Sequence, residues 1–271
     1  MTSSEKAFLK LFLKISFVMN TFHRALSIAA LLALWLILAF VFPPSIVPPP
    51  NAVVAAMWEN LRSGQAFYHL YKTLLRVGFG LILTMFLGIA VGTVMGLSRK
   101  GEVFLDAWVM VGLTVPAIVY SIICLLWFGL NDLAAIVAIG TAAFPAVGIS
   151  IWQGIKGTDT QLVTMGHAFH LSKSAIIRKI IFPQLVPHIL AAMRYALGIC
   201  WKICTTVELI GMSSGVGYML NYWFGLFSMS QVFAWTLLFL LVMFAIEYLL
   251  FKPIESRLTR WRTTLPFPLT A

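Results

Sequence analysis

Charged residues are scarce in this sequence. Only 10% of its 271 residues are charged, whereas 61% are hydrophobic. A soluble domain carries about 25% charged residues, so the composition excludes an ordinary soluble protein and indicates an integral membrane protein. Acidic residues are the rarer kind, 9 against 19 lysines and arginines, giving a net charge of +10. Because the basic residues lie in short blocks between apolar runs, they favour the positive-inside pattern of a membrane protein, with lipid as a partner, over nucleic-acid binding.

Cysteine and metal-binding patterns are also sparse. The three cysteines, Cys124, Cys200 and Cys204, all fall within apolar runs, so they predict packing residues and no disulfide framework. His167 and His170 form an H-x-x-H pair. Two ligands without a nearby acid or cysteine are too few for a zinc site, and we expect no metal in this chain.

Motifs for ATP binding and for hydrolytic catalysis are missing. The sequence has no G-x-x-x-x-G-K-[ST] phosphate loop, so ATP-driven work would have to come from another chain. It also has no H-E-x-x-H motif. Ser213 and Ser214 lie in GMSSGVG, but no histidine follows His188 to activate them. We therefore expect a protein that is not an enzyme and binds no cofactor itself.

Long apolar runs predict an all-α membrane protein with about six transmembrane helices. The expected spans are about 25–42, 70–97, 104–128, 134–155, 189–211 and 232–251. Pro116 should break the third span. Between the first two spans, residues 43–68 predict a proline-rich turn followed by a short amphipathic helix on the far side. The glycines of the second span, 78, 80, 88, 92 and 96, favour close helix packing.

The distribution of basic residues predicts the orientation. One side of the six spans holds 14 of the 19 lysines and arginines, and the other side holds Arg62 alone. The basic side is expected to be cytoplasmic, with both termini on it, in a multi-pass protein of the inner membrane. We expect residues 1–23 to form a basic amphipathic segment, 24–252 the transmembrane domain, and 253–271 a basic cytoplasmic tail. A cleaved signal peptide is disfavoured because no small-residue cleavage site follows the first apolar run.

The segment 157–187 is unusual because it is basic and amphipathic although apolar runs flank it. Its first half places apolar residues at helical spacing, namely Leu162, Met165, Gly166 and Phe169. Ser172 is a plausible N-cap for a second helix, and Pro183 and Pro187 are expected to interrupt that helix before the next span. Such a helix-turn-helix predicts a cytoplasmic surface that docks on a soluble partner.

Ionisable residues inside spans form a second group of candidates. Glu208 lies deep in the predicted fifth span and is costly there unless it is paired. Lys202 and Arg194 on the same span are not at i,i+4 spacing from it, so Arg76 on the second span is a candidate partner. The favoured interpretation is an interhelical ion pair. The alternative is that Arg76 or Lys202 attracts an anion in a transport pathway.

Motifs along the chain resemble the permease subunits of bacterial ATP-binding-cassette importers, in particular the nitrate/sulfonate/taurine group. The stretch IFPQLVPHILAAMRYALGICWKICTTVELIGMSSGVGYML carries the resemblance, together with SRKGEVFLDAWV and LLWFGLNDLAAI. The resemblance covers most of residues 45–252. It implies the type I importer fold, two permease subunits in a homo- or heterodimer, two ATPase subunits that bind ATP and Mg²⁺, and a periplasmic or lipid-anchored solute-binding protein.

The resemblance also assigns a role to the 157–187 loop. In the family this loop carries E-A-A, three residues and a glycine, and it forms the coupling helices that enter a groove on the ATPase. Thr164, Met165 and Gly166 stand at the E-A-A positions here, and His170 stands at the glycine. Because the acid and the turn glycine are replaced, we expect docking through apolar anchors and a changed turn at His170. The coupling residues are thus Leu162, Thr164, Met165, Gly166, Phe169, His170 and Ser172.

Two function classes remain open at this point. The first is the permease subunit of an ATP-driven importer for a small solute such as nitrate, a sulfonate, taurine, bicarbonate or a thiamine-precursor pyrimidine. The second is a secondary transporter or channel that needs no ATPase. Secondary carriers often contain inverted repeats, and we find no convincing internal repeat in this sequence, which favours the importer.

Overall fold

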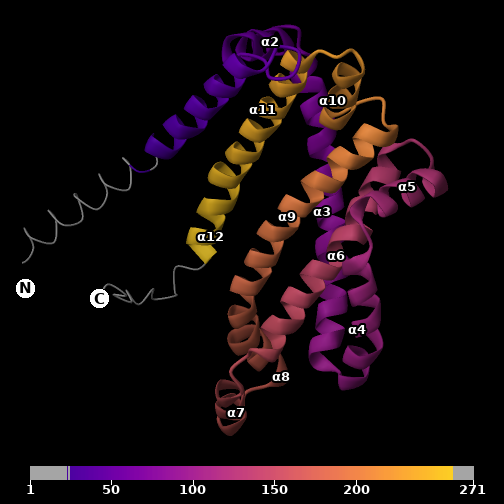
Figure 1. The fold of residues 1–271 in the computed structure, drawn as a ribbon. Coiled ribbons are helices and arrows are strands. Elements are labelled where there is room, and N and C mark those ends of the chain that lie inside the picture. Colours follow the sequence, from indigo (N-terminus) through magenta and orange to yellow (C-terminus); the bar gives the residue numbers. More distant parts are fainter. Residues whose placement is uncertain (1–22, 24, 259–271) are drawn as a thin grey trace, which may run out of the picture.

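The computed structural model describes residue 23 and residues 25–258. The predicted N-terminal segment 1–23, apart from His23, and the tail beyond residue 258 lie outside these residues. Within the described residues, all regular secondary structure is helical (Figure 1). The helices are Ala25–Val41, α2 (Pro50–Arg62), α3 (Gln65–Leu97), α4 (Arg99–Thr114), α5 (Ala117–Phe128), α6 (Asp132–Lys156), α7 (Thr160–Ala168), α8 (Lys173–Ile176), α9 (Phe182–Gly211), α10 (Val216–Gly225), α11 (Met229–Ile246) and α12 (Lys252–Leu258), with π-helical turns η1 (Ile177–Ile181) and η2 (Glu247–Phe251).

Four continuous helices among the described residues are long and apolar enough to cross a membrane. They are Gln65–Leu97, Asp132–Lys156, Lys173–Gly211 and Met229–Arg257. The pair α4 and α5 makes a fifth span when its two halves are counted together, and the chain bends by 96° between them. The break falls at Pro116, as the sequence predicted. Ala25–Val41, the predicted first span, is a shorter apolar helix.

Glycines bring α3 and α6 into close contact at the centre of the bundle. A Cβ atom built on Gly88 would lie 2.5 Å from Val147 of α6, and one built on Gly92 would lie 2.5 Å from the Gly148 carbonyl oxygen. Gly80 and Gly96 face Ile139 and Ile155 in the same way. The close packing predicted for this span is therefore present, except that Gly78 points into open space.

The two prolines expected to interrupt the helix before the fifth span do not do so. Residues Lys173–Gly211 form one helix of 39 residues, so the predicted break at Pro183 and Pro187 is wrong. The helix widens into the π-helical turn η1, and the Phe182 N–H bonds the Ile177 carbonyl five residues earlier. A wider turn accommodates the proline ring without ending the helix.

The last helix also runs further than expected. Residues Met229–Arg257 are continuous through α11, η2 and α12, whereas the sequence placed the end of the span at about residue 251. The Lys252 N–H bonds the Glu247 carbonyl, so the helix continues through a second π-helical turn. Basic residues of the predicted tail thus begin within the same helix.

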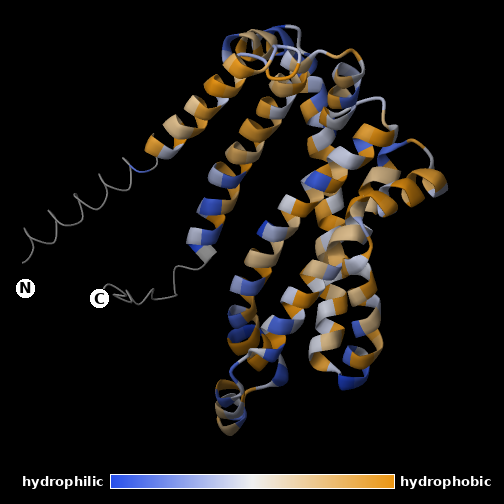
Figure 2. Ribbon diagram, in the orientation of Figure 1, coloured by the Kyte–Doolittle hydropathy of each residue, from blue (hydrophilic) through white to orange (hydrophobic). Residues whose placement is uncertain are grey.

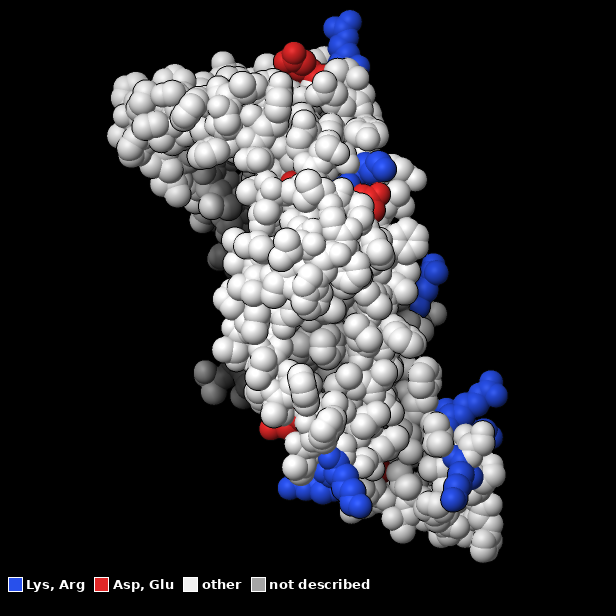
Figure 3. Space-filling view, turned by 90° about the vertical axis from the view of Figure 1, so that its right-hand side faces the viewer, with Lys and Arg blue, Asp and Glu red and all other residues white. Residues whose placement is uncertain are grey.

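The molecule has two distinct ends. Helices α2 and α10 lie at one end of the bundle, and α7 and α8 form the opposite end (Figure 1). Hydrophobic residues predominate on the helices between these ends, with some hydrophilic positions on α9 and toward α12 (Figure 2). Lysine and arginine side chains gather mainly toward the α7–α8 end, and the central surface in this view is almost uncharged (Figure 3). The short amphipathic helix predicted on the far side is α2.

Candidate functional site: a surface hairpin and a buried charge cluster

The turn between α7 and α8 is built around His170. Helix α7 ends where the Leu171 N–H bonds the Gly166 carbonyl at 3.0 Å and the His170 N–H bonds the His167 carbonyl at 2.9 Å. This paired pattern is the Schellman motif, which requires a left-handed residue after the helix. His170 takes that conformation, with φ of 53°. Histidine thus adopts a left-handed conformation that glycine adopts most easily.

Side-chain caps begin both helices of this hairpin, which we define as residues 159–176. The Asp159 carboxylate accepts the Gln161 N–H at 2.8 Å. Ser172 lies at the predicted N-cap and accepts the Ala175 N–H at 3.3 Å. Each cap satisfies a backbone N–H that has no partner within the helix. The caps fix the hairpin's two short helices, which lack the length for stability on their own.

Apolar side chains of α7 point away from the bundle. Leu162, Met165 and Phe169 are 40%, 50% and 73% exposed, although they share one helical face with Gly166. Thr164, at the position of the family's acid, donates its hydroxyl to the Thr160 carbonyl at 2.9 Å. The hairpin thus presents an apolar tip to its surroundings, and such exposed apolar surface is typical of a protein interaction site.

Helix α7 of the hairpin packs against the start of the long helix Lys173–Gly211. Gly166 is buried, and a Cβ built on it would lie 2.9 Å from Ile180 and 3.3 Å from Ile176. Glycine therefore lets α7 pack directly on the start of the Lys173–Gly211 helix. Gln184 adds a polar link, because its side-chain oxygen accepts the Asp159 N–H at 3.0 Å and its side-chain nitrogen donates to the Ile180 carbonyl at 3.0 Å. Packing and hydrogen bonds thus join the hairpin to the start of the long helix.

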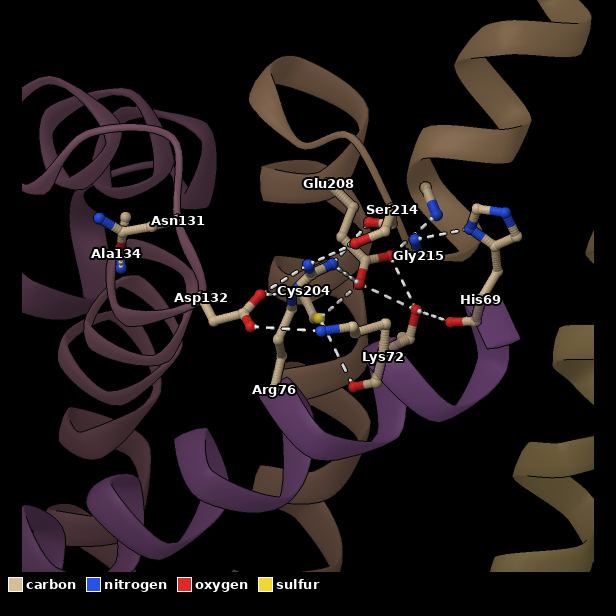
Figure 4. A network of polar contacts seen from close by, with 12 residues as sticks. His69, Lys72, Arg76, Asn131, Asp132, Ala134, Cys204, Glu208, Ser214 and Gly215 are labelled. Atoms are coloured by element: carbon tan, nitrogen blue, oxygen red, sulfur yellow. Dashed lines mark hydrogen bonds and ion pairs between the residues drawn. The ribbon is translucent and has the colours of Figure 1, made fainter. Parts of the chain in front are cut away.

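A buried charge cluster joins three helices at the other end of α9. Arg76 of α3 pairs with Glu208 of α9 at 2.8 Å and with Asp132 of α6 at 2.7 Å (Figure 4). The Arg76 side chain is only 4% exposed and the Glu208 side chain is fully buried. Thr73 donates its hydroxyl to Glu208 at 2.8 Å. The structure thus places Arg76 and Glu208 in the interhelical ion pair that the sequence favoured.

The loop after α9 closes over this cluster. Arg76 donates to the Ser214 carbonyl at 2.6 Å and to the Ser214 hydroxyl at 2.9 Å. The Gly217 N–H donates to Glu208 at 2.9 Å. Gly215 has φ of 114°, and a Cβ atom there would collide with the Glu208 carboxylate. The glycines of this segment therefore let the backbone reach a buried carboxylate, and the loop is held by polar contacts.

Two residues of α3 hold the same loop from its other side. His69 accepts the Gly215 N–H on Nδ1 at 3.0 Å, and the Thr73 hydroxyl accepts the Val216 N–H at 2.9 Å. His69 also stacks on Tyr218 of α10, with ring centroids 5.8 Å apart. The segment between α9 and α10 is thus fixed to α3 by both backbone and aromatic contacts.

The cluster lies near the end of its span. Glu208 stands one turn before the end of α9 at Gly211, and Asp132 is the first residue of α6. Glu208, which the sequence analysis placed deep in its span, thus lies close to the end of α9. The carboxylate is nevertheless removed from solvent by the loop and by α3.

The remaining charged candidates on α9 differ in their surroundings. Arg194 forms an ion pair with Glu247 of η2 and a longer contact, 3.4 Å, with Glu255 of α12. Lys202 is exposed, and within the described part of the chain it makes no side-chain hydrogen bond or ion pair. The structure therefore does not bring Arg194 or Lys202 to the Arg76–Glu208 cluster.

Sequence reasoning missed several residues that build these sites. Asp132, Thr73 and Gln184 act through contacts with partners far along the chain. Asp132 follows the N-cap Asn131 in the short turn NDL, which signals a helix start and no ion pair. Spacing within one segment carries no information about such distant contacts. The glycines of GMSSGVG were the one available signal for a tightly folded loop.

Comparison with known proteins shows the family. The profile of the family described as binding-protein-dependent transport system inner membrane component matches residues 84–260. The chain is 31% identical over 238 residues to the permease protein SsuC of Bacillus subtilis (strain 168), assigned to aliphatic sulfonates transport, covering 87% of this chain and 86% of SsuC. It is 26% identical to the taurine transport system permease protein TauC of Escherichia coli (strain K12), covering 87% and 88% of the two chains. The nitrate import permease protein NrtB of Synechococcus elongatus is 28% identical, covering 70% and 71%.

Solved structures show the same fold. A chain of the MetNI methionine ABC transporter in an inward-facing conformation superposes with a TM-score of 0.57 at 21% identity, covering 75% of this chain and 98% of that one. A chain of an amino acid ABC transporter solved with histidines gives a TM-score of 0.58 at 17% identity, covering 74% and 95%. The fold is therefore that of type I ABC importer permeases, as the resemblance in the sequence implied. By the profile and by its relatives, this chain belongs to the family of binding-protein-dependent transport system inner membrane components.

Proposed function

We propose that this chain forms the membrane pathway of an importer for a small anionic solute, driven by a separate ATPase that docks on the α7–α8 hairpin. ATP and Mg²⁺ bind to the ATPase subunits, and a periplasmic or lipid-anchored binding protein delivers the solute. A second permease subunit, identical or related, completes the pathway. The chain spans the bacterial inner membrane with both termini in the cytoplasm, and it catalyses no reaction itself.

The exposed apolar tip of the hairpin is the observation that carries this proposal. Leu162, Met165 and Phe169 leave apolar surface at the end of the molecule where basic side chains gather. Basic residues mark the cytoplasmic side of a membrane protein, which is the side where ATP is available. A channel or secondary carrier has no need of such a tip, so the tip favours the importer over the ATPase-independent alternative.

Relatives support the anionic class of solute. SsuC, TauC and NrtB are named for sulfonates, taurine and nitrate. Sulfonates and nitrate share a compact, negatively charged group of oxygen atoms, and taurine carries a sulfonate as well. This shared chemistry, together with similarity over at least 70% of the present chain, favours a small oxyanion.

Docking on the hairpin is tested by making its tip polar. We expect the Met165→Asp and Phe169→Asp variants, purified in mild detergent, to carry about tenfold less ATPase than the wild type. The reason is that a buried, unpaired carboxylate is costly at an interface. ATP-dependent uptake into vesicles should fall in parallel. Retention of the ATPase together with wild-type uptake in both variants would contradict the proposal.

A matched control separates docking from general damage. Ile254 on α12 is 41% exposed, similar to Leu162, and it lies outside the hairpin. We expect Ile254→Asp to keep both the ATPase and the uptake. Loss of the ATPase in this control as well would mean that a carboxylate at any exposed apolar position is itself disruptive.

A further inference from the structure

Lys202 is the one charged candidate inside a span that the structure leaves without a partner among the described residues. Arg76 is held by Asp132 and Glu208, so its guanidinium is not free for a solute. Arg194 is likewise paired with Glu247. Lys202 is exposed and forms no side-chain hydrogen bond or ion pair with any described residue.

The position of Lys202 makes contact with lipid unfavourable. It lies in α9 six residues before Glu208, within the long apolar helix Lys173–Gly211. A lysine within a span normally faces water or a partner, since its charge is costly in hydrocarbon. Side chains of a helix lean toward its N-terminus, so Lys202 leans toward the α7–α8 end and away from the nearer membrane surface.

The helix face around Lys202 is polar and open. Tyr195 and Gly198 precede Lys202 by seven and four residues, and Thr206 follows by four, so all four residues lie on one face. Tyr195 is exposed, and a Cβ atom on Gly198 would meet no atom within 4 Å. The opposite face is packed, because Cys200 and Cys204 on it are fully buried.

Among the described residues, no carboxylate faces the side of α9 that carries Lys202. Glu208, the carboxylate on α9, is turned away and buried against Arg76. Glu247 and Glu255, which approach α9 from η2 and α12, both contact Arg194. An ammonium group without a neighbouring carboxylate attracts anions and repels cations.

We infer that Lys202 and the face of α9 it shares with Tyr195 and Thr206 form an anion-binding position on the solute pathway. This inference rests on the proposed function, import of a small anionic solute, and assigns one position on the pathway of that solute. The ammonium group would donate charge-assisted hydrogen bonds to an oxyanion such as a sulfonate. The Tyr195 hydroxyl, two turns away along the same face, is placed to contact the solute as it moves.

Chemical labelling tests whether this face is lined by water. The Lys202→Cys variant in the assembled complex is treated with sulfonatoethyl methanethiosulfonate, a charged thiol reagent, and in parallel with lipophilic N-phenylmaleimide. The wild-type chain sets the background, because its three cysteines are buried. We expect rapid reaction with the charged reagent and slowing by millimolar ethanesulfonate. Reaction with the lipophilic reagent alone, or with neither, would overturn the inference.

Transport measurements test whether the charge matters. We expect Lys202→Gln to lower ATP-dependent ethanesulfonate uptake by about tenfold, the weight of one charge-assisted hydrogen bond, and Lys202→Arg to restore most of it. Lys100→Gln removes the same charge from an exposed lysine at the start of α4 and serves as the control. Equal uptake by Lys202→Gln and wild type would overturn the inference.

Failure of the wild-type complex to use ATP for uptake would instead contradict the proposed function. The labelling experiment would still show whether Lys202 faces water.

Discussion

At the scale of single residues, Arg76 joins helices α3, α6 and α9. Its guanidinium contacts carboxylates from two other helices and the loop that follows α9. Removing one member of a buried ion pair leaves the other charge buried and uncompensated. This destabilises a protein more than replacing both members by apolar residues. Arg76 therefore acts as a structural residue, and the alternative role in attracting an anion is the one that we propose for Lys202.

Replacing Arg76 should strongly destabilise the protein. We expect Arg76→Met to lower the free energy of unfolding by about 3–5 kcal/mol, because Glu208 would remain buried and unpaired. Thermal unfolding of the purified protein in detergent measures the change.

Lys72 offers a matched control for this substitution. It contacts the same Asp132 at 3.8 Å, but its side chain is 31% exposed. Exposed ion pairs contribute about 0–1 kcal/mol, so Lys72→Met should shift the unfolding temperature little. Equal losses of stability in the two variants would show that burial does not govern the cluster.

Part of this cluster was predictable from the sequence. Glu208 and Arg76 are ionisable residues in apolar runs, and the cost of burying each charge alone indicates that they pair. Asp132 and Ser214 were not predictable, since each lies in a turn where a polar residue is ordinary. Their role follows from where the turns are placed by the packing of α3, α6 and α9.

At the scale of elements, the contact between α3 and α6 determines how the central helices pack. Glycines on one face of α3 let side chains of α6 approach its backbone. In a membrane, helices associate through close packing of small residues, because lipid is as apolar as the helix surface. This contact therefore positions α6, and with it Asp132, relative to Arg76.

A side chain at Gly92 should disrupt this packing. We expect Gly92→Val to cost about 3 kcal/mol, because the added Cβ would lie 2.5 Å from the Gly148 carbonyl oxygen, a backbone atom that cannot rotate away. Gly78→Val is the control, as nothing lies within 4 Å of a Cβ there. Unfolding temperatures of the two variants give the comparison, and a loss at Gly78 as large as at Gly92 would refute the explanation.

The helices themselves were largely predictable, because long apolar runs and glycine spacing depend on local sequence. The continuity of Lys173–Gly211 was not. Proline removes a backbone hydrogen-bond donor at a known position. Whether the helix then breaks depends on the hydrogen bonds that the surrounding backbone groups can still form. Here the chain stays helical through a π-helical turn directly before these prolines, and the Gln184 side chain donates to the Ile180 carbonyl.

At the scale of the whole molecule, one continuous helix joins the two sites. Residues Lys173–Gly211 start in the hairpin and end at the charge cluster (Figure 1). Packed helices move as rigid bodies between discrete arrangements. A partner that moves the hairpin therefore acts on α9 and on the contacts of Glu208 with α3 and with the loop.

The overall class was predictable because it depends on composition and on the order of motifs. Hydropathy indicated the membrane spans, and the residues after Ile181 carried the resemblance to importer permeases. The direction in which Leu162, Met165 and Phe169 point depends on how Gly166 packs against Ile176 and Ile180. Such packing between segments is not encoded in the spacing of either segment alone.

The most direct test is to identify what Phe169 touches in a working complex. A photoreactive amino acid is placed at position 169, and membrane vesicles that show ATP-dependent uptake are irradiated. The account predicts a crosslink to the subunit that hydrolyses ATP, formed on the inner side of the membrane. Crosslinks only to lipid, or labelling of position 169 from the outer side, would contradict it.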